Sequence, residues 1–171
     1  MVNDIEGQKG KNYAPSSSTL VLGIGNILLS DEGVGVRVVE ALKEMKLPDN
    51  VELLDGGTGA FDLLDIMAEY NTVIIIDAVQ GGGEPGAVYR FYPSDIGMQK
   101  KCLTSVHQVG LMDALSMARL TGHSPQKIIV FGIEPEDMGW GLELSVKITK
   151  VSLSSFVLLF FGIDKNFYNF R

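Results

Sequence analysis

The sequence feature that most constrains the fold is the stretch of residues 19–35, TLVLGIGNILLSDEGVG. Its first part, residues 20–24, is a short apolar run that leads into glycine and asparagine, which predicts a buried strand followed by a tight turn. Residues 34–46 repeat apolar side chains at helical spacing and are predicted to form a helix. The acidic pair Asp31 and Glu32 therefore stands at a strand-to-helix junction, where open α/β sheets point side chains into a ligand crevice.

Strand and helix patterns alternate along the rest of the chain. Further strands are predicted at residues 51–54, 73–76, 87–92 and 127–133, and further helices at residues 61–68 and 107–120. Parallel strands need crossover connections, and these are nearly always right-handed helices. The order therefore predicts an α/β fold with three layers, in which a twisted, mostly parallel sheet carries helices on both faces.

The length of 171 residues fits one domain. We expect residues 19–171 to form a single α/β domain behind a flexible leader, residues 1–18, which lacks the pattern of a secretion signal. The tail, residues 146–171, is apolar and poor in charge. Periodicity does not decide whether residues 151–163 form a strand or a helix that is buried in the fold or in an oligomer contact. Residues 141–145 fit either an edge strand or the lead into a last helix.

Composition excludes several classes of protein. A net charge of −7 argues against nucleic-acid binding, because a basic face is needed to neutralise phosphates. The longest apolar run, residues 156–162, is too short to span a membrane. One cysteine, Cys102, allows no internal disulfide, so a reducing compartment is expected. These observations predict a cytoplasmic protein.

Polar residues gather at the predicted carboxyl ends of the strands. Asp31 and Glu32 follow the first strand, Asp55 the second and Asp77 the third, while His107 opens a later helix. Two carboxylates and one imidazole at the mouth of a sheet would form a mixed oxygen and nitrogen metal site. This donor set is compatible with nickel, zinc, manganese or iron(II) and does not select one of them.

Each of these residues also has a purely structural interpretation. Acids in the first turn of a helix, such as Asp31 and Glu32, are favoured by the helix dipole. Asp55 stands before two glycines, as a turn or cap residue does, and His107 fits an ordinary helix start. Asp77 is harder to explain in this way, because an ionised carboxylate at the end of a buried strand needs a partner.

Other known motifs match poorly. Gly23 and Gly25 resemble the start of a dinucleotide-binding fingerprint, but Leu28 occupies the position of the third glycine. A nucleotide-binding function would rest on these two glycines alone. The chain contains no GxSxG, HExxH or CxxC motif. Cys102 could in principle act as a nucleophile, although an incidental cysteine is the simpler interpretation.

Five stretches together resemble one family. They are GIGNILLSDEGVG, DGGTGAFDLL, IIIDAV, SVHQVGLMDAL and GIEPEDMGWGLELS. In order and spacing they are similar to the hydrogenase maturation endopeptidases, the proteases that remove the C-terminal extension from the large subunit of nickel–iron hydrogenases once nickel is in place. The resemblance covers residues 19–145 and rests on several independent long motifs.

The resemblance implies a site, position by position. It places the family's metal ligands on Glu32, Asp77 and His107. It places the family's substrate-engaging box on Asp55, Gly56, Gly57 and Thr58. The implied fold, a twisted and mainly parallel sheet between helices, agrees with the alternation of strands and helices. The tail differs from the family, whose members usually finish with an amphipathic, charged helix.

The resemblance also implies a function. It is that of a soluble endopeptidase whose protein substrate, the precursor of a hydrogenase large subunit, carries the nickel that Glu32, Asp77 and His107 bind; zinc or cadmium could substitute. Either the metal activates a water molecule, or it only docks the substrate and a carboxylate acts as general base in an aspartyl-type reaction, with Asp55 and Asp77 as the catalytic residues. The alternative function is a non-catalytic, nickel-sensing chaperone of hydrogenase assembly.

Overall fold

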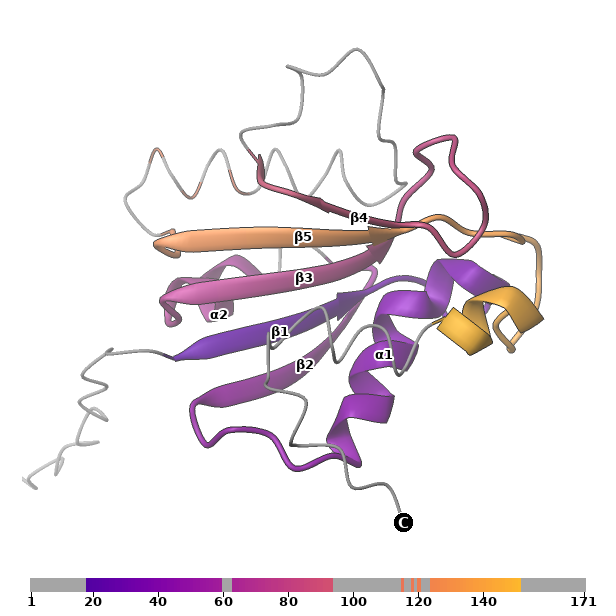
Figure 1. Ribbon diagram of the computed structural model, residues 1–171. Helices are drawn as coiled ribbons and strands as arrows, with labels where there is room; N and C mark the ends of the chain where they lie inside the picture. The colour runs from indigo at the N-terminus through magenta and orange to yellow at the C-terminus, as the bar shows by residue number, and fades with distance from the viewer. Residues whose placement is uncertain are drawn as a thin grey trace, which may run out of the picture.

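The computed structural model describes residues 18–59, 63–93, 115, 118, 120 and 124–151. Its centre is a five-stranded sheet in the order β2-β1-β3-β5-β4 (Figure 1). The strands are β1 (Thr19–Ile24), β2 (Val51–Gly57), β3 (Thr72–Ala78), β4 (Val88–Phe91) and β5 (Lys127–Ile133). Four of them are parallel, and β4 alone pairs antiparallel, at the edge next to β5.

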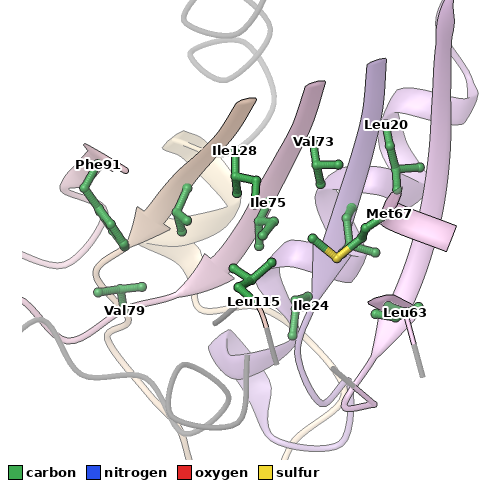
Figure 2. Close-up of a cluster of buried hydrophobic side chains, with 12 residues drawn as sticks. Leu20, Ile24, Leu63, Met67, Val73, Ile75, Val79, Phe91, Leu115 and Ile128 are labelled. Atoms are coloured by element: carbon green, nitrogen blue, oxygen red, sulfur yellow. The ribbon is translucent and has the colours of Figure 1, made fainter. Parts of the chain in front are cut away.

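Helices cover both faces of the sheet. On one face, α1 (Val34–Lys43) packs through Val38 and Leu42 into a core that includes alternate side chains of β1, β3 and β5. On the other face, α2 (Leu64–Ala68) contributes Met67 to a second core, which Figure 2 shows with Leu20 and Ile75. The predicted three-layer α/β architecture is therefore confirmed.

The strand β3 explains why the sheet is buried on both sides. Val73 and Ile75 belong to the core below α2, whereas Ile74 and Ile76 belong to the core below α1. All four side chains are at most 8% exposed. A strand that buries both faces needs an unbroken run of apolar, β-branched residues, and this is the pattern from which a central strand was predicted.

Several element boundaries differ from the prediction. The helix α1 ends at Lys43, three residues earlier than expected. The strand β2 runs on to Gly57, because its pairing with β1 continues past a shift in register, from Gly23 with Asp55 to Ile24 with Gly57. Asp55 therefore lies within β2, not after it. The strand β3 likewise continues to Ala78 and includes Asp77, since both residues pair with β5.

A close approach of backbones positions the start of α1. A Cβ atom on Gly35 would lie 2.2 Å from the carbonyl oxygen of Ile76 and 2.3 Å from that of Ile24. Only glycine lets the first turn of the helix rest on the ends of β1 and β3 at this distance. The short 3-10 helix η1 (Ser30–Gly33), which leads into α1, is thereby held at the carboxyl edge of the sheet.

The end of the described chain returns to this edge. Gly141 forms an isolated parallel bridge with Leu29, and residues 146–151 are helical, so residues 141–145 lead into a last helix. In the described part of the chain, no helix is long and apolar enough to cross a membrane. The predictions for residues 1–17, for the tail from residue 152 onward and for most of the helix at residues 107–120 lie outside the described residues.

Candidate functional site

The carboxyl ends of β1 and β3 form the topological switch point of the sheet. From β1 the chain proceeds to β2 on one side and then returns to β3 on the other side, so the crossovers diverge between β1 and β3. Ligands of open α/β sheets bind at such a point, outside the carboxyl ends of the strands. Glu32, in η1 after the turn that follows β1, and Asp77, near the end of β3, flank this switch point.

Both of these carboxylates are buried. Glu32 is 4% exposed and Asp77 is 2% exposed, and solvent does not reach Glu32 Oε2 or Asp77 Oδ1. Carboxyl groups buried in this way require polar or charged partners. Carboxylate oxygens are suitable ligands for divalent metal ions, so both residues have the chemistry of metal ligands.

The third predicted ligand is not among the residues that the structure describes. His107 lies outside them, as do Cys102 and His123. Within the described ranges, no group of three or more His, Cys, Asp and Glu side chains forms a metal site. The structure thus brings Glu32 and Asp77 to the same edge, and the place of His107 stays a prediction.

Asp55 lies at the same edge but in a different environment. Its side chain is exposed, and its Oδ1 accepts a hydrogen bond from the backbone N–H of Gly57 at 2.9 Å. Gly57 has a φ of +50°, and its carbonyl oxygen accepts a hydrogen bond from Gly25. Asp55 therefore lies in a strand and not in a turn, and the Gly57 N–H orients its exposed carboxylate. Thr58, next along the chain, is exposed as well.

Asp31, the neighbour of Glu32, has a structural role. It is 0% exposed, and its carboxylate accepts three backbone hydrogen bonds. Oδ2 accepts from the N–H groups of Glu136 and Asp137, both at 2.9 Å, and Oδ1 accepts from that of Ser145 at 2.7 Å. One carboxylate thus clamps both ends of the loop between β5 and the last helix, which lies beside the start of α1 (Figure 1).

Backbone hydrogen bonds reinforce the clamp. The Ser30 N–H donates to the carbonyl of Gly141 at 2.9 Å, and the Gly141 N–H donates to that of Leu28 at 3.0 Å. The Asp31 N–H donates to the carbonyl of Asp137 at 3.0 Å. The segment that contains Glu32 and the loop after β5 are consequently fixed to each other.

Glu134, at the end of β5, is a buried acid that the sequence analysis missed. It is 7% exposed, and its Oε2 accepts hydrogen bonds from Tyr89 Oη at 2.6 Å, from Gly81 N at 2.7 Å and from Gly83 N at 3.2 Å. It therefore holds the glycine loop after β3 against β4. The rule that singled out Asp77, an acid at the end of an apolar strand, would also have found Glu134.

The environment of Glu134 changes two pKa values. Burial raises the pKa of Glu134, but hydrogen bonds from Tyr89 and from the backbone of the glycine loop outweigh it and leave the pKa below its usual value of 4.5. Burial, followed by the hydrogen bond to Glu134 and its charge, raises the pKa of Tyr89 above 10.0. Glu134 therefore stays ionised at neutral pH and Tyr89 stays protonated.

The variant Glu134→Gln should be less stable than the wild type, and the difference should depend on pH. Because folding lowers the pKa of Glu134, its ionised form stabilises the fold fully above 4.5, and this contribution disappears as the pH falls through the folded-state pKa. Near pH 7 the variant should lose about 1.5 to 3 kcal/mol, the range for hydrogen bonds to a charged group. Urea unfolding of both proteins across a pH series measures the difference, which should shrink toward about pH 3. Glu69→Gln, at an exposed acid of the same charge, is the control, and an equal loss at every pH would contradict the assignment.

The sequence model of the family described as hydrogenase maturation protease matches residues 36–155 of this chain. The chain belongs to the hydrogenase maturation protease family. The matched range contains Asp55, Asp77 and His107, and Glu32 lies shortly before it. The resemblance stated from the sequence motifs is therefore confirmed.

Relatives of known name agree with this membership. The chain is 46% identical over 121 residues to the hydrogenase 2 maturation protease of Escherichia coli (strain K12), an alignment that covers 70% of this chain and 74% of that protein. It is 40% identical over 143 residues to the hydrogenase expression/formation protein HupD of Rhizobium leguminosarum bv. viciae, covering 80% and 69%.

Solved structures of the family share the fold. The hydrogenase maturating endopeptidase HybD from E. coli superposes with a TM-score of 0.68 at 40% identity, covering 78% of this chain and 83% of that one. The maturation protease HycI from Thermococcus kodakarensis KOD1 gives a TM-score of 0.69 at 25% identity, covering 86% and 92%. As a family member, this protein is a peptidase of hydrogenase maturation.

Proposed function

We propose that this maturation protease removes the C-terminal extension of a nickel-loaded hydrogenase large-subunit precursor in the cytoplasm. It recognises the nickel carried by that substrate through Glu32, Asp77 and His107. The nickel is part of the substrate and not a resident cofactor, and zinc or cadmium can take its place. Recognition through the metal explains specificity, because an empty precursor offers no ion to complete the shared coordination shell.

The observation that carries this proposal is the position of Glu32 and Asp77. They flank the switch point of the sheet and are 4% and 2% exposed. Buried anionic oxygens favour a cation, and a site made from only two or three protein ligands leaves coordination positions for groups of the substrate. Family membership supplies the class of reaction, peptide-bond hydrolysis during hydrogenase maturation.

Two chemical roles for the site are compatible with this proposal. When bound, the metal either lowers the pKa of a water molecule or only docks the substrate. In the second case a carboxylate is the general base. Asp55 suits that role because its side chain is exposed and the Gly57 N–H orients it, 2.9 Å from Oδ1. Gly56, Gly57 and Thr58 would then engage the substrate backbone beside it.

The test is a cleavage assay with purified precursor, loaded with nickel or left empty. We expect the loaded precursor to be shortened at its C-terminus and the empty one to remain intact, as measured by mass spectrometry of the large subunit. Cleavage of both forms at equal rates would overturn recognition through the metal. A stable complex with the loaded precursor, without shortening, would instead identify a nickel-sensing chaperone.

A further inference from the structure

An exposed apolar patch lies next to the candidate site and has no role in the proposed chemistry. Four large side chains form it, and we call them the apolar patch: Ile27, Leu28, Trp140 and Leu142. Their exposed fractions are 38%, 49%, 87% and 59%. Trp140 is the single tryptophan of the chain. Leaving a tryptophan and a leucine largely in water costs solvation free energy that burial in an interface would recover.

The two segments that carry the apolar patch are fixed side by side. Gly141, between Trp140 and Leu142, donates to the Leu28 carbonyl and accepts from the Ser30 N–H, at 3.0 and 2.9 Å. The Leu142 carbonyl accepts a hydrogen bond from Arg37 Nη2 at 2.8 Å. The Asp31 carboxylate holds both ends of the same loop. The apolar patch is therefore organised before any partner binds, which lowers the entropy cost of binding.

The charges around the apolar patch indicate the kind of partner. Glu136, Asp137 and Glu143 are exposed on the same loop, and Lys147 nearby pairs with Glu136 at 2.9 Å. An apolar centre containing an aromatic side chain, bordered by polar groups, is the usual anatomy of a protein interface. The acidic border disfavours nucleic acid and anionic lipid, and it favours a protein surface that carries basic residues.

We infer that the apolar patch is the docking surface for the body of the protein substrate. The substrate contacts it through an apolar area of its own that is bordered by basic residues. This inference rests on the proposed function, because the substrate is the large-subunit precursor. The patch is continuous with the site: Leu28 stands four residues before Glu32, on the turn that leaves β1. A substrate seated on it would have its metal and C-terminal extension beside the carboxyl edge of the sheet.

The experiment measures binding and cleavage of nickel-loaded precursor by the double variant Trp140→Ser/Leu142→Ser. The Kd and KM should rise about 30-fold, which corresponds to the loss of one interface hot spot, while kcat at saturation stays within about twofold. The matched control is Leu120→Ser. Leu120 is 85% exposed, and Leu115, five residues before it, belongs to the core on the face of the sheet that α2 covers. This control should bind and cleave as the wild type does.

The possible outcomes distinguish failure of the docking-surface inference from failure of the proposed function. Unchanged Kd and KM in the folded double variant would overturn the docking surface even if the wild type cleaves normally. A wild type that binds precursor without cutting it would overturn the proposed function, and the Kd values would still decide the docking surface. Thermal unfolding confirms folding, and Leu28→Ser provides the same test if the double variant does not fold. Higher salt should slow association with the wild type, and no salt effect would contradict a basic partner.

Discussion

Asp77→Asn is expected to abolish shortening of the nickel-loaded precursor. The substitution keeps the shape of a side chain that is 2% exposed but removes its negative charge, and a neutral amide is a much weaker ligand for a divalent ion. We expect the rate to fall by at least about 100-fold, since changes to groups that merely support metal ligands already cost 10- to 100-fold. His107→Ala should have the same effect. Mass spectrometry of the precursor over time measures both rates.

Matched substitutions separate loss of the site from general damage. Asp65→Asn changes an exposed aspartate of α2, on the opposite face of the sheet, and should leave the rate unchanged. His123→Ala changes the other histidine of the chain, which the proposal leaves out. Calorimetric titration with nickel or cadmium should show weaker binding to the Asp77 and His107 variants alone. Normal processing by both of these variants would remove the site assignment.

The fold was predictable from the sequence because its strongest signals are local. The run from Val73 to Ile76 is β-branched throughout, and only a strand buried on both faces makes use of such a run. Once that strand is central, the alternation of strands and helices leaves few right-handed arrangements. The end of β2 was not predictable in this way. Gly56 and Gly57 resemble a turn in sequence, but Gly57 still pairs with Ile24 of β1 after a shift in register, which keeps this end within the strand.

Only those residues of the candidate site that stand at the ends of strands could be predicted from the sequence pattern. Glu32 and Asp77 lie where the strand-end rule places them, but the same rule does not distinguish Glu32 from its neighbour Asp31. The difference arises from η1, which directs Asp31 toward a loop more than a hundred residues away. The partners of Asp31 are backbone N–H groups, which every residue except proline offers. No residue type in the sequence therefore indicates the clamp.

Asp31→Asn should destabilise the protein more than most surface substitutions do. The carboxylate accepts hydrogen bonds from three backbone N–H groups, those of Glu136, Asp137 and Ser145, at 2.7 to 2.9 Å. An asparagine has one acceptor oxygen and would turn its amide, itself a donor, toward at least one of these donors. Hydrogen bonds to a charged group contribute about 1.5 to 3 kcal/mol each, so the loss of one of them should lower the free energy of unfolding by at least that amount. Urea unfolding measures it.

The control for Asp31 is an acid that makes an exposed contact. Glu40 forms an ion pair with Arg37 at 3.0 Å, and its side chain is 45% exposed, so Glu40→Gln should cost less than about 1 kcal/mol. Equal losses in the two variants would show that the buried clamp is no stronger than a surface ion pair. Because the clamp ties the loop of Trp140 to the segment that contains Glu32, Asp31→Asn should also weaken binding of the precursor. If the variant is less stable yet binds and cleaves the precursor normally, Asp31 contributes to stability and not to substrate binding.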